Sequence, residues 1–110
     1  MNKIWVRNSA LAALVVLAAC GGRRDEVFSS KDSECLARAM YFESNRSSRD
    51  GMIAVGTVVM NRVASDAFPG SVCAVVGQKG QFAPGVMTKD MREDASLALA
   101  RDAADSVLAG

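Results

Sequence analysis

The segment "CLARAMYFES", residues 35–44, has the pattern of a helix with one apolar face. Leu36 and Met40 are one helical turn apart, and Glu43 falls seven residues after Leu36 on the same side. The pattern therefore predicts a helix over residues 33–44 that carries a carboxylate on its apolar face, close to its C-terminal end.

Glu43 in such a position has a chemical use. Apolar surroundings and the negative end of the helix dipole both disfavour a carboxylate, so both favour the protonated form of Glu43. A protonated carboxyl group can act as a general acid near neutral pH. The spacing leaves an alternative, in which Glu43 ends the helix at the surface and pairs with a nearby arginine such as Arg46.

Residues 52–63, "MIAVGTVVMNRV", fit two kinds of element. The β-branched residues favour a strand, whereas the length and the nearly continuous apolar character favour a buried central helix. We choose the helix, with Ser48 available as its cap and Gly56 permitting a close backbone contact. Asn61 and Arg62 then lie at its polar end.

The rest of the chain predicts two more helices and a connecting loop. A short helix over residues 71–76 should stop at Gly77, and a last helix should start at Thr88 or Asp90. Six residues form the expected apolar stripe of the last helix: Met91, Ala95, Ala98, Leu99, Ala103 and Leu108. Residues 78–86, "QKGQFAPGV", predict a turn or hairpin. The expected fold is a small, mainly α domain.

The N-terminal segment has the features of an export signal. Lys3 and Arg7 give it a positive start, and residues 10–19 form an apolar stretch too short to cross a bilayer as a mature helix. The motif "LAAC" ends at Cys20 and matches the lipobox of bacterial lipoproteins, in which the signal is removed and the cysteine is acylated. The alternative is a plain secretory signal that is cut nearby.

This pattern divides the chain into three parts. We expect residues 1–19 to be a lipoprotein signal peptide, residues 20–32 to be the lipid anchor and tether, and residues 33–110 to be the folded domain. Gly21 after the lipidated cysteine resembles the outer-membrane sorting pattern, so the expected location is the periplasmic side of the cell envelope, on the outer membrane.

The three cysteines support an exported domain. Acylation of Cys20 would leave Cys35 and Cys73 free to form a disulfide in an oxidising compartment. Two buried free thiols are the alternative. A zinc site is not expected, because the chain has no histidine and no CxxC motif.

Charge and composition exclude several classes of function. Removing Lys3 and Arg7 from the 13 basic residues leaves 11 against 12 acidic residues, a net charge of −1. We therefore expect no nucleic-acid partner. A catalytic triad with histidine is impossible, no phosphate-binding glycine loop is present, and we predict no metal or cofactor.

Three motifs together resemble the spore-cortex-lytic (SleB-type) family of cell-wall hydrolases. They are "ECLARAMYFES", "DGMIAVGTVVMNRV" and "FPGSVCAVVGQKGQF", which occur in this order within residues 34–110. The resemblance implies a lysozyme-like domain, related to lytic transglycosylases, that cuts the glycan strands of peptidoglycan and uses Glu43 as its catalytic acid.

The resemblance also implies substrate-binding residues, and each has a structural alternative. Gln81 and Phe82 match a groove motif, although Phe82 can instead close the core. Asn61 and Arg62 match an asparagine–arginine pair, although such residues more often cap or brace a helix end. Tyr41 can line the groove or pack beneath it.

The chain departs from the family pattern at two places. Ser47 stands where family members usually have a second glutamate, and the family usually continues beyond the position of Gly110. We therefore expect the domain to lack part of the sugar-binding groove at its C-terminal end. The main expectation is a peptidoglycan lytic transglycosylase or muramidase-type glycosidase; the alternative is a catalytically inactive lipoprotein that binds peptidoglycan.

Overall fold

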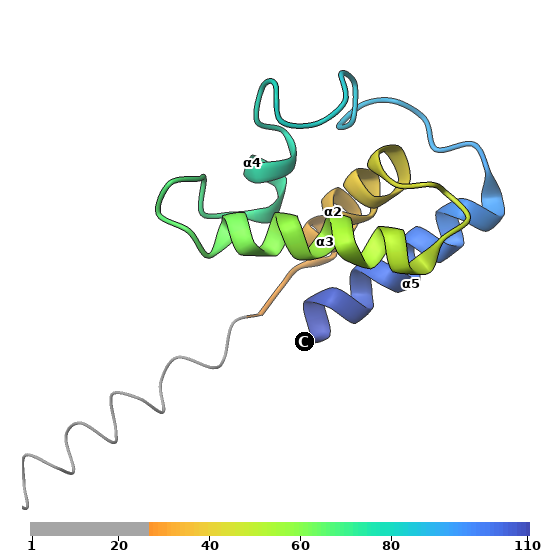
Figure 1. The fold of residues 1–110 in the computed structure, drawn as a ribbon, viewed down its shortest axis with the longest axis horizontal. Coiled ribbons are helices and arrows are strands. Elements are labelled where there is room, and N and C mark those ends of the chain that lie inside the picture. Colours follow the sequence, from red (N-terminus) through yellow and green to blue (C-terminus); the bar gives the residue numbers. More distant parts are fainter. Residues whose placement is uncertain (1–26) are drawn as a thin grey trace, which may run out of the picture.

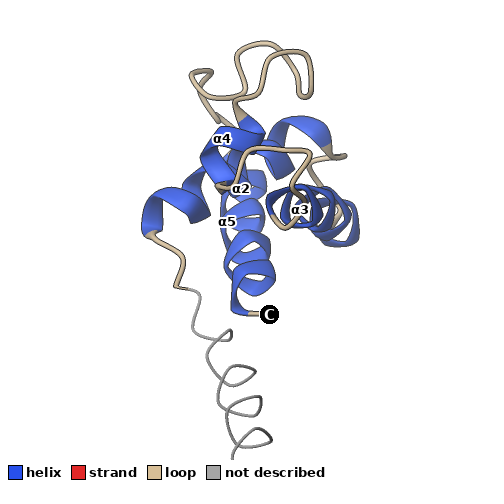
Figure 2. Ribbon diagram, turned by 90° about the vertical axis from the view of Figure 1, so that its left-hand side faces the viewer, coloured by secondary structure: helices blue, strands red, loops and turns tan. Residues whose placement is uncertain are grey.

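The computed structural model describes residues 27–110, which contain four α-helices and no strand (Figures 1 and 2). The helices are α2 (Ser30–Glu43), α3 (Arg49–Val63), α4 (Val72–Val76) and α5 (Asp94–Ala109). The expected mainly helical class is confirmed, and residues 78–86 form a loop with turns rather than a hairpin. The expected signal peptide and Cys20 lie outside the described residues.

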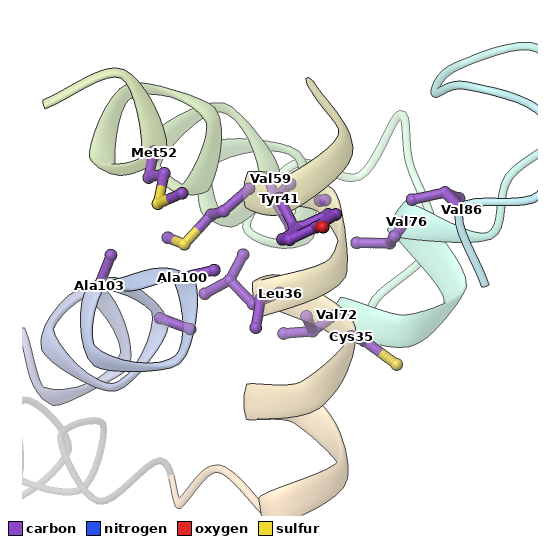
Figure 3. Close-up of a cluster of buried hydrophobic side chains, with 14 of the residues drawn as sticks. Cys35, Leu36, Tyr41, Met52, Val59, Val72, Val76, Val86, Ala100 and Ala103 are labelled. Carbon is purple, nitrogen blue, oxygen red and sulfur yellow. The ribbon is translucent and has the colours of Figure 1, made fainter. Parts of the chain in front are cut away.

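Helix α2 lies at the centre of the described fold: like α3 it packs against each of the other three helices, but six of its residues are buried against three in α3. Figure 3 shows Leu36 of α2 pointing toward Ala100 of α5, while Val72 and Val76 approach α2 from α4. Tyr41 also lies in this cluster and is 1% exposed. The segment that carries Glu43 is therefore the element around which the others are arranged.

Helix α3 forms as predicted, but it is not the buried central helix. Its buried residues are Met52, Gly56 and Val59, all on one face, whereas Val58 is 45% exposed. A Cβ atom at Gly56 would come within 2.3 Å of the Met40 methyl carbon. The glycine thus permits the expected close contact, here between α3 and a side chain of α2.

Helix α2 begins earlier than the expected residue 33. Ser29 is its N-cap and forms a capping box with Asp32, in which each side chain accepts a hydrogen bond from the other residue's backbone N–H. Phe28, just before this cap, is partly buried against the core. Phe28 and the first residues of α2 therefore lie within the segment that we expected to be tether, residues 20–32.

Helix α5 starts at Asp94, later than the predicted Thr88 or Asp90. Residues 88–93 instead contact α2 through backbone groups that a helix would have used internally. The predicted stripe is also partly wrong, since Met91 precedes the helix and Ala95 and Ala98 are exposed. Ala103 is buried as expected, and Leu99 and Leu108 are partly buried.

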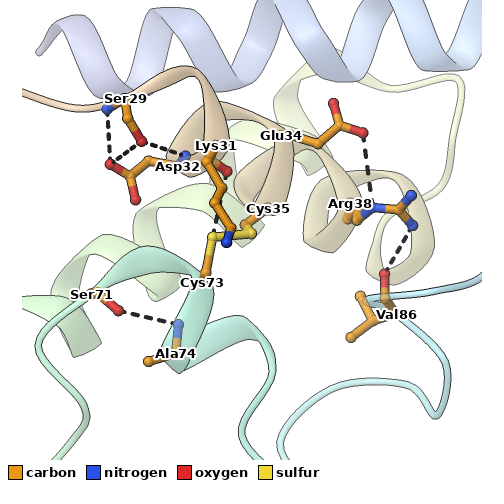
Figure 4. The surroundings of a disulfide bond; sticks show 10 residues. All are labelled: Ser29, Lys31, Asp32, Glu34, Cys35, Arg38, Ser71, Cys73, Ala74 and Val86. Carbon is orange, nitrogen blue, oxygen red and sulfur yellow. Dashed lines mark hydrogen bonds and ion pairs between the residues drawn. A yellow bond between two sulfur atoms is a disulfide. The ribbon is translucent and has the colours of Figure 1, made fainter.

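Helix α4 matches its prediction closely. Ser71 is the N-cap, its hydroxyl accepting the Ala74 N–H, and Gly77 is the C-cap. A disulfide joins Cys35 of α2 to Cys73 of α4, which confirms the expected pairing (Figure 4). Within residues 27–110, no helix has both the length and the apolar character needed to cross a bilayer.

Candidate active site

Glu43 is the last residue of α2. The helix stops there because Ser44 is extended, with its N–H and its hydroxyl both donating to the Met40 carbonyl. Glu43 is exposed, so the expectation that it lies on a buried apolar face is wrong. Leu36 and Met40 on the apolar face of α2 are fully buried by the packing of the domain. The side chain of Glu43, at the end of the same face, is not buried.

The loop between α4 and α5, residues 77–93, crosses the end of α2 and contacts Glu43 directly (Figure 1). The Ala83 N–H donates a hydrogen bond of 3.1 Å to Oε2 of Glu43. A backbone amide is a donor only, so it fixes one carboxyl oxygen as an acceptor. The loop thereby orients the acid without burying it.

The geometry of Ala83 comes from a tight turn that the sequence encodes. Residues 83–86 read "APGV", and the Val86 N–H donates to the Ala83 carbonyl at 3.1 Å. Gly85 has a φ of 82°, a conformation that glycine adopts without strain. Proline followed by glycine with positive φ is the signature of a type II turn. The turn is closed by the Ala83 carbonyl, and the N–H of the same residue is the donor to Glu43.

A groove with a volume of about 680 Å³, here called the α2 groove, lies between the end of α2 and residues 88–93. It is lined by Tyr41, Phe42, Arg46, Thr88, Lys89, Asp90, Arg92 and Glu93. The lining combines two aromatic rings with charged side chains of both signs. Flat rings and hydrogen-bonding polar groups suit the apolar faces and hydroxyl groups of sugars.

Arg46 is held firmly within the α2 groove. Its Cζ atom lies 4.6 Å from the centre of the Tyr41 ring, and its Nη1 pairs with Glu93 at 3.1 Å. The alternative is therefore right that Glu43 ends the helix at the surface, but the expected ion pair between Arg46 and Glu43 is not observed. Glu43 keeps its second oxygen, Oε1, free of any hydrogen bond within residues 27–110.

A second groove, here called the loop groove, has a volume of about 730 Å³ and is more apolar. It is formed by α4 and the first part of the loop, including Val76, Phe82, Ala83, Pro84 and Met87. Phe42, next to Glu43 in sequence, lines the α2 groove, and Ala83, bonded to Glu43, lines the loop groove. Glu43 is in the lining of neither groove, but it connects to the α2 groove through Phe42 and to the loop groove through Ala83.

The expected substrate-binding residues separate into two groups. Tyr41 is almost fully buried yet forms part of the lining of the α2 groove, and its hydroxyl oxygen accepts the Glu93 N–H at 3.0 Å. Arg62 braces the loop, since its guanidinium lies 5.1 Å from the Phe68 ring centre and 5.5 Å from that of Phe82. Phe82 is partly buried against the core and also lines the loop groove.

The other two expected residues, Asn61 and Gln81, are exposed. Neither side chain makes a hydrogen bond within the part of the chain that the structure describes. Gln81 lies in the loop beside Phe82, and its N–H donates to the Gln78 carbonyl at 3.2 Å. Their side chains are available to a ligand, and a substrate-binding role for them stays a prediction.

Sequence reasoning missed three groups that contact α2 or the loop: the Ala83 amide, Glu93 and Arg38. Glu93 accepts from Arg46 and from Ser96, and it adds a carboxylate to the α2 groove. Arg38 donates to two carbonyls of the loop. The "APGV" turn was the one sequence signal that pointed to the amide. Across residues 27–110, no three acidic, cysteine or histidine side chains gather as a metal site.

Comparisons with known proteins point to one family. The model of the cell wall hydrolase family matches residues 46–110, which contain α3, α4, α5 and the 77–93 loop. Glu43 lies just before the matched region. No solved structure matches the chain.

The similar relatives are spore cortex-lytic enzymes. That of Bacillus subtilis (strain 168) is 39% identical over 49 residues, covering 44% of this chain and 16% of the relative. That of Bacillus cereus is 36% identical over 55 residues, covering 50% of this chain and 21% of the relative. The matched part of this chain therefore spans about a fifth or less of these relatives' lengths. Because the family model matches more than half of the chain, the protein belongs to the cell wall hydrolase family.

Proposed function

We propose that this domain cleaves the glycan strands of peptidoglycan, with Glu43 as general acid and then general base. The observation that carries the proposal is the position of Glu43: an exposed carboxyl group, oriented by the amide of Ala83, a residue of the loop groove, and directly following Phe42 of the α2 groove. A glycan strand that lies across both grooves would place a glycosidic oxygen near Glu43. Family membership and the spore cortex-lytic relatives support this substrate class.

The bound glycan has a second role in this proposal. Glu43 is exposed in the free protein, so the low-dielectric surroundings that assist proton transfer have to come from the substrate. Sugar rings that lie over Phe42 of the α2 groove and Phe82 of the loop groove would exclude water from this region. The Arg62 guanidinium lies over the Phe82 ring, 5.5 Å from its centre, and helps to hold the ring in position.

The proposed reaction is a lytic transglycosylation. Glu43 gives its proton to the oxygen that links N-acetylmuramic acid to N-acetylglucosamine, and the bond from that oxygen to C1 breaks. The 6-hydroxyl of the same muramic acid then attacks C1 and returns its proton to Glu43. One carboxyl group is enough for both steps, whereas an inverting hydrolase needs a second carboxylate about 6.5–9.5 Å away to activate water.

Mass spectrometry of digested sacculi tests the reaction type. We expect 1,6-anhydromuramic ends in the soluble fragments, since the attacking hydroxyl belongs to the sugar itself. Reducing ends in their place would contradict the transglycosylase mechanism and would indicate attack by water. Glu93, the other glutamate of the site, would then be the first base to test, by Glu93→Gln.

An inactive peptidoglycan-binding protein is the second candidate, because Ser47 occupies the position of the family's second glutamate. Ser47 is exposed, and its hydroxyl donates to the Asn45 side chain, so it supplies no carboxylate at this point. Cosedimentation with sacculi without any release of soluble fragments would favour this candidate. Release of fragments by the same preparation would exclude it.

We also propose that Cys20 anchors the protein to the outer membrane from the periplasmic side, on the basis of the "LAAC" motif. Stable anchoring requires more than one acyl chain, which a lipoprotein-type cysteine carries. We expect Cys20→Ala to leave the protein unprocessed or to move it from the membrane fraction to the soluble fraction. Normal processing together with unchanged membrane fractionation would contradict the proposal, and Cys20→Ala is not expected to affect the fold of residues 27–110.

A further inference from the structure

The 77–93 loop is held to α2 by side chains of α2. Arg38 donates from Nη1 to the carbonyl oxygens of Lys89 at 2.7 Å and Val86 at 3.3 Å. Tyr41 accepts the Glu93 N–H, and Glu43 accepts the Ala83 N–H. Three side chains near the C-terminal end of α2 therefore hold the loop at four residues, and the candidate catalytic acid is one of the attachment points.

Arg38 is connected to the Ala83 amide through a short chain of hydrogen bonds. It holds the Val86 carbonyl, and the N–H of Val86 donates to the Ala83 carbonyl within the closed turn. The Lys89 carbonyl, its stronger contact, belongs to a turn in which the Lys89 N–H donates to Gly85 at 2.7 Å. Both contacts therefore act on the segment that presents the amide to Glu43.

The Arg38 guanidinium also forms an ion pair within α2. Its Nε lies 3.8 Å from Oε1 of Glu34, one helical turn earlier, and Figure 4 shows the side chain extending from Glu34 toward Val86. Arg101 of α5 pairs with the other oxygen of Glu34 at 3.5 Å. Arg38 thus differs from Arg101, because both contact Glu34 but only Arg38 reaches the loop.

The Ala83 amide favours protonation of one particular oxygen of Glu43. In a neutral carboxyl group the carbonyl oxygen is a better hydrogen-bond acceptor than the hydroxyl oxygen, so an N–H group that faces Oε2 favours the hydroxyl hydrogen on the other oxygen. The proton of the neutral acid is directed to Oε1. If the loop moved away from α2, the carboxyl group could rotate, and either of its oxygens could carry the proton.

We propose that Arg38 is a positioning residue of the Glu43 site: by tying the turn of residues 83–86 to α2, it keeps the Ala83 amide on Oε2 and leaves Oε1 as the proton-donating oxygen. The inference rests on the proposed role of Glu43. Arg38 acts through the loop and touches neither the substrate nor the reacting atoms.

Activity and binding measurements on three variants test the proposal. We expect Arg38→Ala to slow the release of soluble fragments roughly tenfold to a hundredfold, the scale of a misplaced catalytic group, while cosedimentation with sacculi changes less than about twofold. Arg38→Lys keeps a donor within reach of the carbonyls and should recover part of the rate. Arg101→Ala is the matched control, and it should stay within about twofold of the wild type.

An NMR measurement tests the contact without requiring activity. Glu43→Gln should shift the Ala83 amide resonance in the wild-type background, and the same change should leave that resonance nearly unmoved in Arg38→Ala. If Arg38→Ala fails to fold, Arg38→Lys should show an intermediate shift. An equal Ala83 shift in all backgrounds, or full activity of Arg38→Ala, would overturn the role of Arg38. Full activity of Glu43→Gln would instead overturn the proposed function and leave the amide result interpretable.

Discussion

Replacing Glu43 with glutamine should lower the release of glycan fragments by about a hundredfold or more, the usual contribution of a general acid. Glutamine has nearly the shape of glutamate, and its side-chain oxygen can still accept the Ala83 N–H. The loop should therefore stay in place, and the variant should bind sacculi like the wild type. The change removes the ability of the side chain to donate and accept the transferred proton.

The control for Glu43→Gln is Asp66→Asn, which also removes one negative charge. Asp66 is exposed in the connection between α3 and α4. We expect Asp66→Asn to keep nearly the full rate of fragment release, so that the effect at Glu43 cannot be ascribed to net charge. A fully active Glu43→Gln variant, measured beside this control on the same sacculi, would remove Glu43 from catalysis.

The helices that the sequence predicted well are those with local start and stop signals. Ser48 and Ser71 cap α3 and α4 through their own hydroxyl groups, and Gly77 ends α4. Each of these signals acts within a few residues, so no knowledge of distant contacts was needed. The Pro84–Gly85 pair likewise marked a turn that the structure contains.

The errors arise where distant segments compete with a local pattern. The sequence around Thr88 favoured the start of a helix. Arg38 and Tyr41 instead form hydrogen bonds with the backbone of residues 88–93, and α5 begins only at Asp94. Helical spacing also placed Glu43 on the apolar face, but spacing does not say which neighbour covers each turn. At the last turn of α2 the neighbour is a backbone amide, which orients a carboxylate instead of burying it.

Removing the disulfide should destabilise the domain strongly. The bond joins residues 38 apart in sequence, and a bridge of this span stabilises by roughly 3–4 kcal/mol through restriction of the unfolded chain. The contribution is large for this domain, because a short chain can bury only a modest core. Cys35 is 4% exposed, so a double change of Cys35 and Cys73 to alanine also leaves a small packing defect.

Denaturant unfolding with and without a reducing agent separates these two effects. We expect the wild type to lose roughly 3–4 kcal/mol of unfolding free energy on reduction, and the double alanine variant to be insensitive to the reducing agent. Cys20→Ala, which keeps the pair, should behave like the wild type.

Because α4 leads directly into the 77–93 loop, loss of the disulfide should also reduce fragment release at temperatures where the domain is still folded. Two alkylatable thiols at Cys35 and Cys73 in the exported, unreduced protein would contradict the prediction, as would an unfolding midpoint that reduction does not change.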